Sequence, residues 1–92
     1  KFKVNSIPGG GVIGGLTVDV AGNILFSLEN PGKIGLFDPV NEKFRIVKAV
    51  LGDSKPYDIE NDEQGNIWFA DMKRNALCKL DGQVMSLLVT VN

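Results

Sequence analysis

The chain has 92 residues, of which 43% are hydrophobic and 23% charged, and its net charge is −1. This length holds at most one small domain with a limited core. No run of Lys and Arg offers a phosphate-binding face, and no apolar stretch approaches the roughly 20 residues of a membrane-spanning helix. We therefore expect neither nucleic acid nor a membrane as a partner. The single cysteine, Cys78, excludes an intrachain disulfide and is expected to be a small apolar residue in a strand.

Residues 1 to 13 come before the first clear structural pattern. They begin with KFKV, in which basic and apolar residues alternate. We expect residues 1 to 4 to form the outer strand of a preceding repeat unit, a blade in the sense used below. The glycine-rich PGGGVIGG, residues 8 to 15, lacks the spacing and the Lys-Ser/Thr ending of a phosphate-binding loop. It is expected to be a flexible connection. The chain starts with Lys1 rather than Met, which indicates processing, a designed piece or a part of something longer.

The rest of the chain repeats one pattern, in residues 14 to 50 and again in residues 51 to 92. Residues 15 to 38 align without a gap with residues 58 to 81, a period of 43, and six of the 24 positions are identical. The identical pairs are Asp19 and Asp62, Gly22 and Gly65, Asn23 and Asn66, Ile24 and Ile67, Phe26 and Phe69, and Asp38 and Asp81. Because the matches fall at turns and strand cores, they indicate a structural repeat.

Each copy begins with two predicted strands joined by a tight turn. The first strand alternates apolar and polar residues around Leu16 or around Ile59. Asp-x-x-Gly-Asn then predicts a hairpin turn in which Gly, and with more strain Asn, accepts a positive φ. A calcium loop would need further spaced oxygen ligands and a distal Glu, which are absent here, so a hairpin turn is expected rather than a calcium site. The second strand has successive apolar residues, ILF or IWF, so Trp68 and Phe69 are expected in a core covered on both faces rather than as a sugar-stacking pair.

Two more strands complete each predicted copy. The third strand covers residues 34 to 37 or 76 to 80, after the loop ENPGK or DMKRN. The fourth strand of the first copy, KFRIVK at residues 43 to 48, alternates apolar and charged residues, as expected of a charge-protected edge strand. Residues 83 to 90 are expected to fill the same place in the second copy.

Four strands per unit, a period of 43 and no helical periodicity predict an all-β fold of two four-stranded antiparallel β-propeller blades. Propellers close with typically about 4–8 blades, so two blades leave apolar faces open. Three resolutions remain. Several copies form a closed ring, three copies giving six blades; the chain is part of a longer propeller; or the repeat is engineered.

The motifs resemble those of streptogramin B lyase (virginiamycin B lyase) and the wider group of NHL-repeat and gluconolactonase-like propellers. The resemblance covers roughly residues 14 to 91 and is carried by PYDIENDEQGNIWFAD and by Phe37-Asp38-Pro39. In the lyase family it implies catalysis by histidines and an acid near a divalent cation. This chain has no histidine, so no catalytic position is carried over, and we predict no catalytic residue, metal ligand or cofactor here.

A propeller usually binds ligands where the loops between blades meet the loops between second and third strands. Here those loops are residues 5 to 15, 29 to 33, 50 to 58 and 71 to 76. The candidate binding residues on this axial face are Asp58, Asp71, Lys73, Arg74, Glu29 and Asn30. The alternative for them is ordinary solvated loop charge.

The expected function is a scaffold that binds a small molecule or a partner on its axial face, without catalysis in this chain alone. The first alternative is a fragment of a lyase-like or lactonase-like enzyme whose catalytic and metal-binding residues lie in other blades. The second is a structural or engineered repeat without a ligand.

Overall fold

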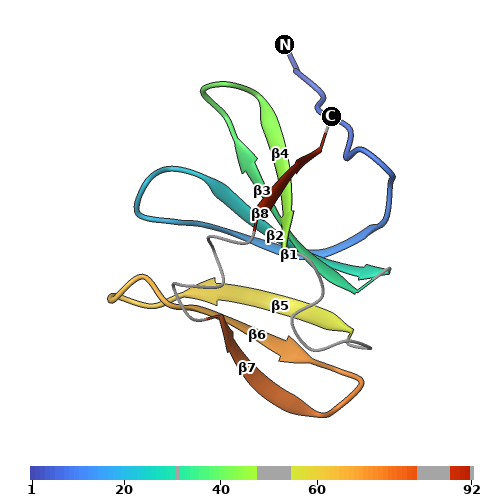
Figure 1. Ribbon diagram of the computed structural model, residues 1–92, viewed down its shortest axis with the longest axis vertical. Helices are drawn as coiled ribbons and strands as arrows, with labels where there is room; N and C mark the ends of the chain where they lie inside the picture. Colours follow the sequence, from blue (N-terminus) through green and yellow to red (C-terminus); the bar gives the residue numbers. More distant parts are fainter. Residues whose placement is uncertain (31, 48–54, 81–87, 92) are drawn as a thin grey trace.

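The computed structural model describes residues 1–30, 32–47, 55–80 and 88–91, and these residues form two antiparallel sheets (Figure 1). The first sheet has five strands in the order β1-β2-β3-β4-β8, and the second has three in the order β5-β6-β7. The strands are β1 (Val12–Val18), β2 (Ile24–Asn30), β3 (Lys33–Asp38), β4 (Lys43–Val47), β5 (Pro56–Asn61), β6 (Ile67–Asp71), β7 (Ala76–Leu80) and β8 (Leu88–Val91). The predicted all-β class is confirmed.

The two Asp-x-x-Gly-Asn turns have the same geometry. In the first, Oδ1 of Asp19 accepts hydrogen bonds from the amides of Ala21 and Asn23, at 3.0 and 2.8 Å. Asp62 accepts the equivalent two bonds, and Gly22 and Gly65 take φ values of 88° and 82°. The asparagines keep ordinary φ and donate their side-chain amides to the aspartates instead. These carboxylates therefore build turns by accepting from the chain itself.

The last strand departs from the predicted arrangement. β8 pairs with β4, from Phe44 opposite Val91 to Val47 opposite Leu88, so β4, in the predicted edge strand, is not at the edge, and the two sheets have five and three described strands rather than four each. The physical reason is that the charges of KFRIV lie on its side chains, whereas its outer backbone groups remain able to accept another strand. Within the described residues, β7 pairs only with β6.

The N-terminal segment also differs from the expectation. Residues 1 to 4 lie in no strand, because a strand needs a neighbouring strand and none of the described strands pairs with them. The segment instead lies along the first sheet. Ile7 packs against the cluster of Phe26, Leu28 and Phe44, and Lys3 forms an ion pair with Glu42 in the turn between β3 and β4.

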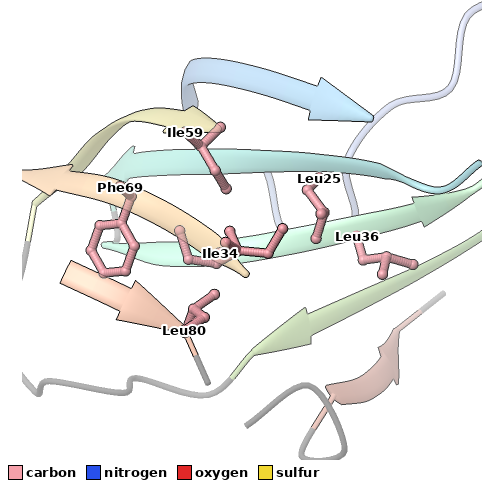
Figure 2. Close-up of a cluster of buried hydrophobic side chains, with 7 residues drawn as sticks. Leu25, Ile34, Leu36, Ile59, Phe69 and Leu80 are labelled. Carbon is pink, nitrogen blue, oxygen red and sulfur yellow. The ribbon is translucent and has the colours of Figure 1, made fainter. Parts of the chain in front are cut away.

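The main core lies between the two sheets (Figure 2). The first sheet contributes Leu25, Ile34 and Leu36, and the second contributes Ile59, Ile67, Phe69 and Leu80. Each of these side chains is at most 4% exposed. Cys78 packs against the edge of this cluster from β7, as predicted for a small apolar residue. Face-to-face packing of the sheets is therefore the main source of apolar burial.

The first strands of the two sheets, β1 and β5, lie side by side and run in the same direction (Figure 1). The Cβ position of Gly15 is 3.7 Å from Oδ1 of Asp58, and Asn61 donates to the carbonyl of Val18 at 2.5 Å. Both pairs are 43 residues apart, which is the period of the repeat. Equivalent positions of the two copies therefore face each other across the interface.

The prediction that IWF is covered on both faces is only half right. Phe69 is buried, but Trp68 is 38% exposed. Its Nε1 donates to Oδ2 of Asp62 at 2.9 Å, and Nζ of Lys79 lies 5.7 Å from the ring centroid. The reason is that, among the described residues, no third sheet covers the outer face of β6, so the indole lies on the surface with polar neighbours.

Candidate functional site

The turns after β2 and β6 lie at the same end of the two sheets, on the right of Figure 1. β1 begins at Val12 opposite Asn30 at the end of β2, and β5 begins at Pro56 opposite Asp71 at the end of β6. Because β1 and β5 run in parallel, these four strand ends come together. The loops expected on the axial face thus share one end of the described structure. Residues 31 and 50 to 54 lie outside it.

Two predicted residues, Glu29 and Asp58, lie beside the glycines of β1. The Cβ position of Gly14 is 3.1 Å from Cγ of Glu29, and that of Gly15 is 3.7 Å from Oδ1 of Asp58. Asp58 is exposed, while Glu29 is partly buried. The acidic side chains of Glu29 and Asp58 therefore lie beside two neighbouring glycines of β1. We call Gly14, Gly15, Glu29 and Asp58 the acidic strand end.

Asp71, one of the candidate binding residues, is bonded within its own turn. Its side chain is buried, and its Oδ1 accepts from the amides of Lys55, Lys73 and Arg74 at 3.1, 3.0 and 3.3 Å. Arg74 also donates from its guanidinium to Oδ2 at 2.9 Å. Burial raises the pKa of this carboxyl, but the hydrogen bonds outweigh it and leave the pKa below its ordinary value. Asp71 thus holds the β6–β7 turn and ties it to the start of β5.

The remaining candidate binding residues, Arg74, Lys73 and Asn30, do not all lie in one place. Arg74 is engaged by Asp71, so it belongs to the turn. Lys73 is exposed on the same turn. The side chain of Asn30 lies outside the described part of the chain, although its backbone pairs with Val12. The structure therefore brings Glu29 and Asp58 to one place, and Asp71, Lys73 and Arg74 to another at the same end.

Sequence reasoning missed two residues that hold the acidic strand end in place. Ser27 is fully buried, and its hydroxyl donates to the carbonyl of Tyr57 across the sheet interface. The ring of Tyr57 lies over Gly14, with Cδ1 3.1 Å from the Cβ position of that glycine. The signal was present in the sequence, because a Gly-Gly pair inside a strand indicates close approach of another backbone. Gly14 and Gly15 belong to the segment expected to be a flexible connection, but they lie in strand β1.

Two apolar surfaces stay open on the outer sides of the sheets. The first-sheet outer face consists of Leu16, Ile24, Phe26 and Phe37, which line a hollow of about 250 Å³ together with Asn5, Ile7, Ile13 and Phe44. The second-sheet outer face consists of Trp68, Ala70, Leu77 and Lys79, and a hollow of about 220 Å³ lies over its first three residues. Leu16 is 62% exposed and Leu77 is 78% exposed. Side chains of this size at such exposure are typical of interaction surfaces.

Two further observations concern metal binding and the reactivity of the thiol in the described residues. They contain no group of three or more Cys, Asp and Glu side chains placed to hold a metal ion. Burial, with a smaller contribution from Asp71, raises the pKa of the Cys78 thiol, so the thiol stays protonated at neutral pH and is a poor nucleophile. The arrangement is suited to binding through carboxylates and apolar surface.

Within the described residues, no helix is long and apolar enough to cross a membrane. No protein-family model and no curated protein matches this chain.

Proposed function

We propose that the chain is a pair of β-propeller blades that act as a binding scaffold, and that a small cationic molecule binds at the acidic strand end. Catalysis is not part of this proposal for the chain alone. The observation that carries it is the parallel packing of β1 against β5 with equivalent residues facing each other.

This packing is what a propeller requires. In a propeller, successive blades are related by rotation about a central axis, and the first strand of each blade lies nearest to that axis. Rotation brings each position of one innermost strand close to the equivalent position of the next. The contacts between Gly15 and Asp58 and between Thr17 and Glu60, both 43 residues apart, fit this relationship. Two sheets stacked without such an axis have no reason to keep the period of the repeat.

The acidic strand end is the best candidate for the ligand site. It lies where β1 and β5 begin, and it carries the acidic side chains of Glu29 and Asp58 beside Gly14 and Gly15. Carboxylates close to exposed aromatic surface, here Tyr57 at 45% exposure, suit an amine or another organic cation.

The test is a titration of the chain with spermidine as a cationic probe, followed by backbone NMR. We expect the signals of Gly14, Gly15 and Asp58 to shift together. Asp58→Asn should weaken the apparent affinity about tenfold, the size expected for one charge-assisted hydrogen bond. The matched control is Glu63→Gln, because Glu63 is an exposed carboxylate in the turn at the opposite end. Equal weakening by both variants would reduce the effect to general charge and contradict the proposal.

A second candidate function is part of a lyase-like or lactonase-like enzyme whose other blades hold the catalytic groups. It draws on the resemblance of the two repeats to those of the streptogramin B lyase family and on the position of Glu29 and Asp58. Under this alternative, Mg²⁺ alone should shift the same NMR signals in the absence of any organic ligand. A response to spermidine without a response to Mg²⁺ would favour the scaffold.

A further inference from the structure

We propose that the first-sheet outer face of one copy docks on the second-sheet outer face of another copy, head to tail, by the same packing that joins the two sheets within one chain. This inference rests on the proposed propeller arrangement and names its partner, a second copy of this chain. The two open faces correspond, by the period of the repeat, to the two faces that already form the main core within the chain.

The first-sheet outer face is the equivalent of a face that is already buried. Leu16, Ile24, Phe26 and Phe37 lie 43 residues before Ile59, Ile67, Phe69 and Leu80. The latter four are the contribution of the second sheet to the main core. The same positions in the first sheet line the open hollow. A face of this pattern is therefore built to receive a sheet, and in the second copy of the repeat it has received one.

The second-sheet outer face supplies the matching half. Trp68, Leu77 and Lys79 lie 43 residues after Leu25, Ile34 and Leu36, which are the contribution of the first sheet to the main core. Two of the three positions keep a large apolar side chain. At the third, Nζ of Lys79 lies 5.7 Å from the ring centroid of Trp68, and its ammonium can remain at the rim in water while the aliphatic part covers apolar surface.

The innermost strands are also sterically compatible. Within the chain, Gly14 and Gly15 of β1 accommodate Tyr57 and Asp58 of β5. Between two copies, β5 of one copy would lie beside β1 of the next, so each large residue would again face a glycine.

One polar contact would also be repeated between copies. Thr17 donates to Glu60 at 3.4 Å within the chain, and head-to-tail docking brings Glu60 of one copy to Thr17 of the next. Two other bonds would not recur, because Ala70 stands at the position equivalent to Ser27 and Val18 at the position equivalent to Asn61. The contact between copies should therefore be weaker than the contact within the chain. Asn5 and Ile7 line the same hollow and must move aside.

Because the two docking faces are different, the contact is heterologous and continues until a ring closes. Each copy contributes two sheets, so rings of two, three or four copies correspond to the usual size of propellers. We expect three copies.

The experiment is light scattering on a sizing column with the 92-residue chain and two variants. Leu16→Glu places a charge on the first-sheet outer face, and Leu77→Glu places one on the second. Both side chains are more than half exposed, so we expect both variants to fold, which circular dichroism and Trp68 fluorescence can verify. Val40→Glu is the control, because Val40 is 87% exposed in a turn outside both faces.

The unmodified chain and the control should have a mass of about 30 kDa, three times that of the 10.0 kDa chain. Each variant alone should be monomeric. An equimolar mixture of Leu16→Glu and Leu77→Glu should form a complex of two chains and no larger one, because only one intact face remains on each partner. This outcome is specific to head-to-tail docking, since like-to-like docking would leave one variant able to pair with itself.

Several results would overturn the proposal. These are a monomeric unmodified chain at about 100 μM, an associating single variant, or a mixture that stays monomeric. Spermidine titration of the same samples separates this failure from failure of the proposed function, because the acidic strand end lies within one copy. A monomer that binds spermidine at Asp58 keeps the scaffold and loses the docking, whereas a ring without that response keeps the docking and loses the ligand site.

Discussion

The ring of Phe26 on β2 lies over Gly35 on the neighbouring strand β3. A Cβ on Gly35 would be 2.3 Å from Cζ of that ring, far inside contact distance. The absence of a side chain at Gly35 therefore lets the ring lie flat against the sheet, where it is 4% exposed and meets Phe44 edge to face, with the centroids 6.2 Å apart.

Gly35→Ala should lower the free energy of unfolding by about 1–3 kcal/mol, because the ring must leave its place over the strand. Gly15→Ala is the matched control: its nearest neighbour would be 3.5 Å away, an ordinary contact, and it should cost far less. Urea unfolding at a fixed protein concentration measures both. A partial rescue of Gly35→Ala by Phe26→Leu is also expected, and equal stability of Gly35→Ala and the unmodified chain would refute the relationship.

Ser27→Ala should also destabilise the chain by about 1–3 kcal/mol, because the carbonyl of Tyr57 then loses its buried donor. The change should show in hydrogen exchange as faster opening of β5 relative to β3. The matched control is Ser6→Ala, because Ser6 is an exposed serine outside both sheets. If Ser6→Ala and Ser27→Ala have the same effect, the hydroxyl of Ser27 does not stabilise the interface.

Asp71→Asn should lower the free energy of unfolding by about 1–3 kcal/mol at pH 7, because a buried charged acceptor of four hydrogen bonds is replaced by an amide. The pKa of Asp71 is lowered in the folded state, so its contribution is complete above the unfolded pKa near 3.8 and is lost as the pH falls through the folded pKa. The difference between Asp71→Asn and the unmodified chain should therefore shrink below about pH 4. A difference that stays constant down to pH 2 would exclude the ionised carboxylate as its cause.

Trp68→Phe should raise the pKa of Asp62. The hydrogen bond from the indole of Trp68 is the largest influence that lowers this pKa from 3.8 to about 2, with further bonds from the amides of Asn66 and Gln64. Titration of the side-chain carboxyl carbon by NMR gives the value directly. Lys79→Met is the control, since it removes the cation near the ring and leaves the indole in place. An unchanged pKa in Trp68→Phe would mean that the turn amides alone hold the carboxylate ionised.

The sequence was most informative where backbone conformation depends on one or two residues. The turns at Asp19 and Asp62 were predicted because Gly22 and Gly65 accept a left-handed backbone and the aspartates bond locally. The strands on either side followed from their apolar patterns. Contacts of this kind depend on neighbours in the sequence, which periodicity and turn chemistry describe well.

Features that depend on distant segments were harder to predict. The pairing of β8 with β4 depends on which free sheet edge meets the last strand. The alternation of apolar and polar residues in these two strands does not specify the partner. Trp68 was expected to be buried because its residue type resembles its neighbours, but its exposure depends on a third sheet. Asp71 looked like an axial ligand because it follows a strand, whereas its burial depends on the start of β5.

The pairing of β4 with β8 has a consequence for how the chain acquires its structure. Phe44 and Val91 are neighbours in the first sheet, so the three strands of the second sheet lie between β4 and β8 in the sequence. During synthesis, β1 to β4 and then β5 to β7 leave the ribosome before the strand that completes the first sheet exists. Contacts of such long range form slowly, so the outer edge of β4 remains available to other strands until β8 has been made and has paired with it.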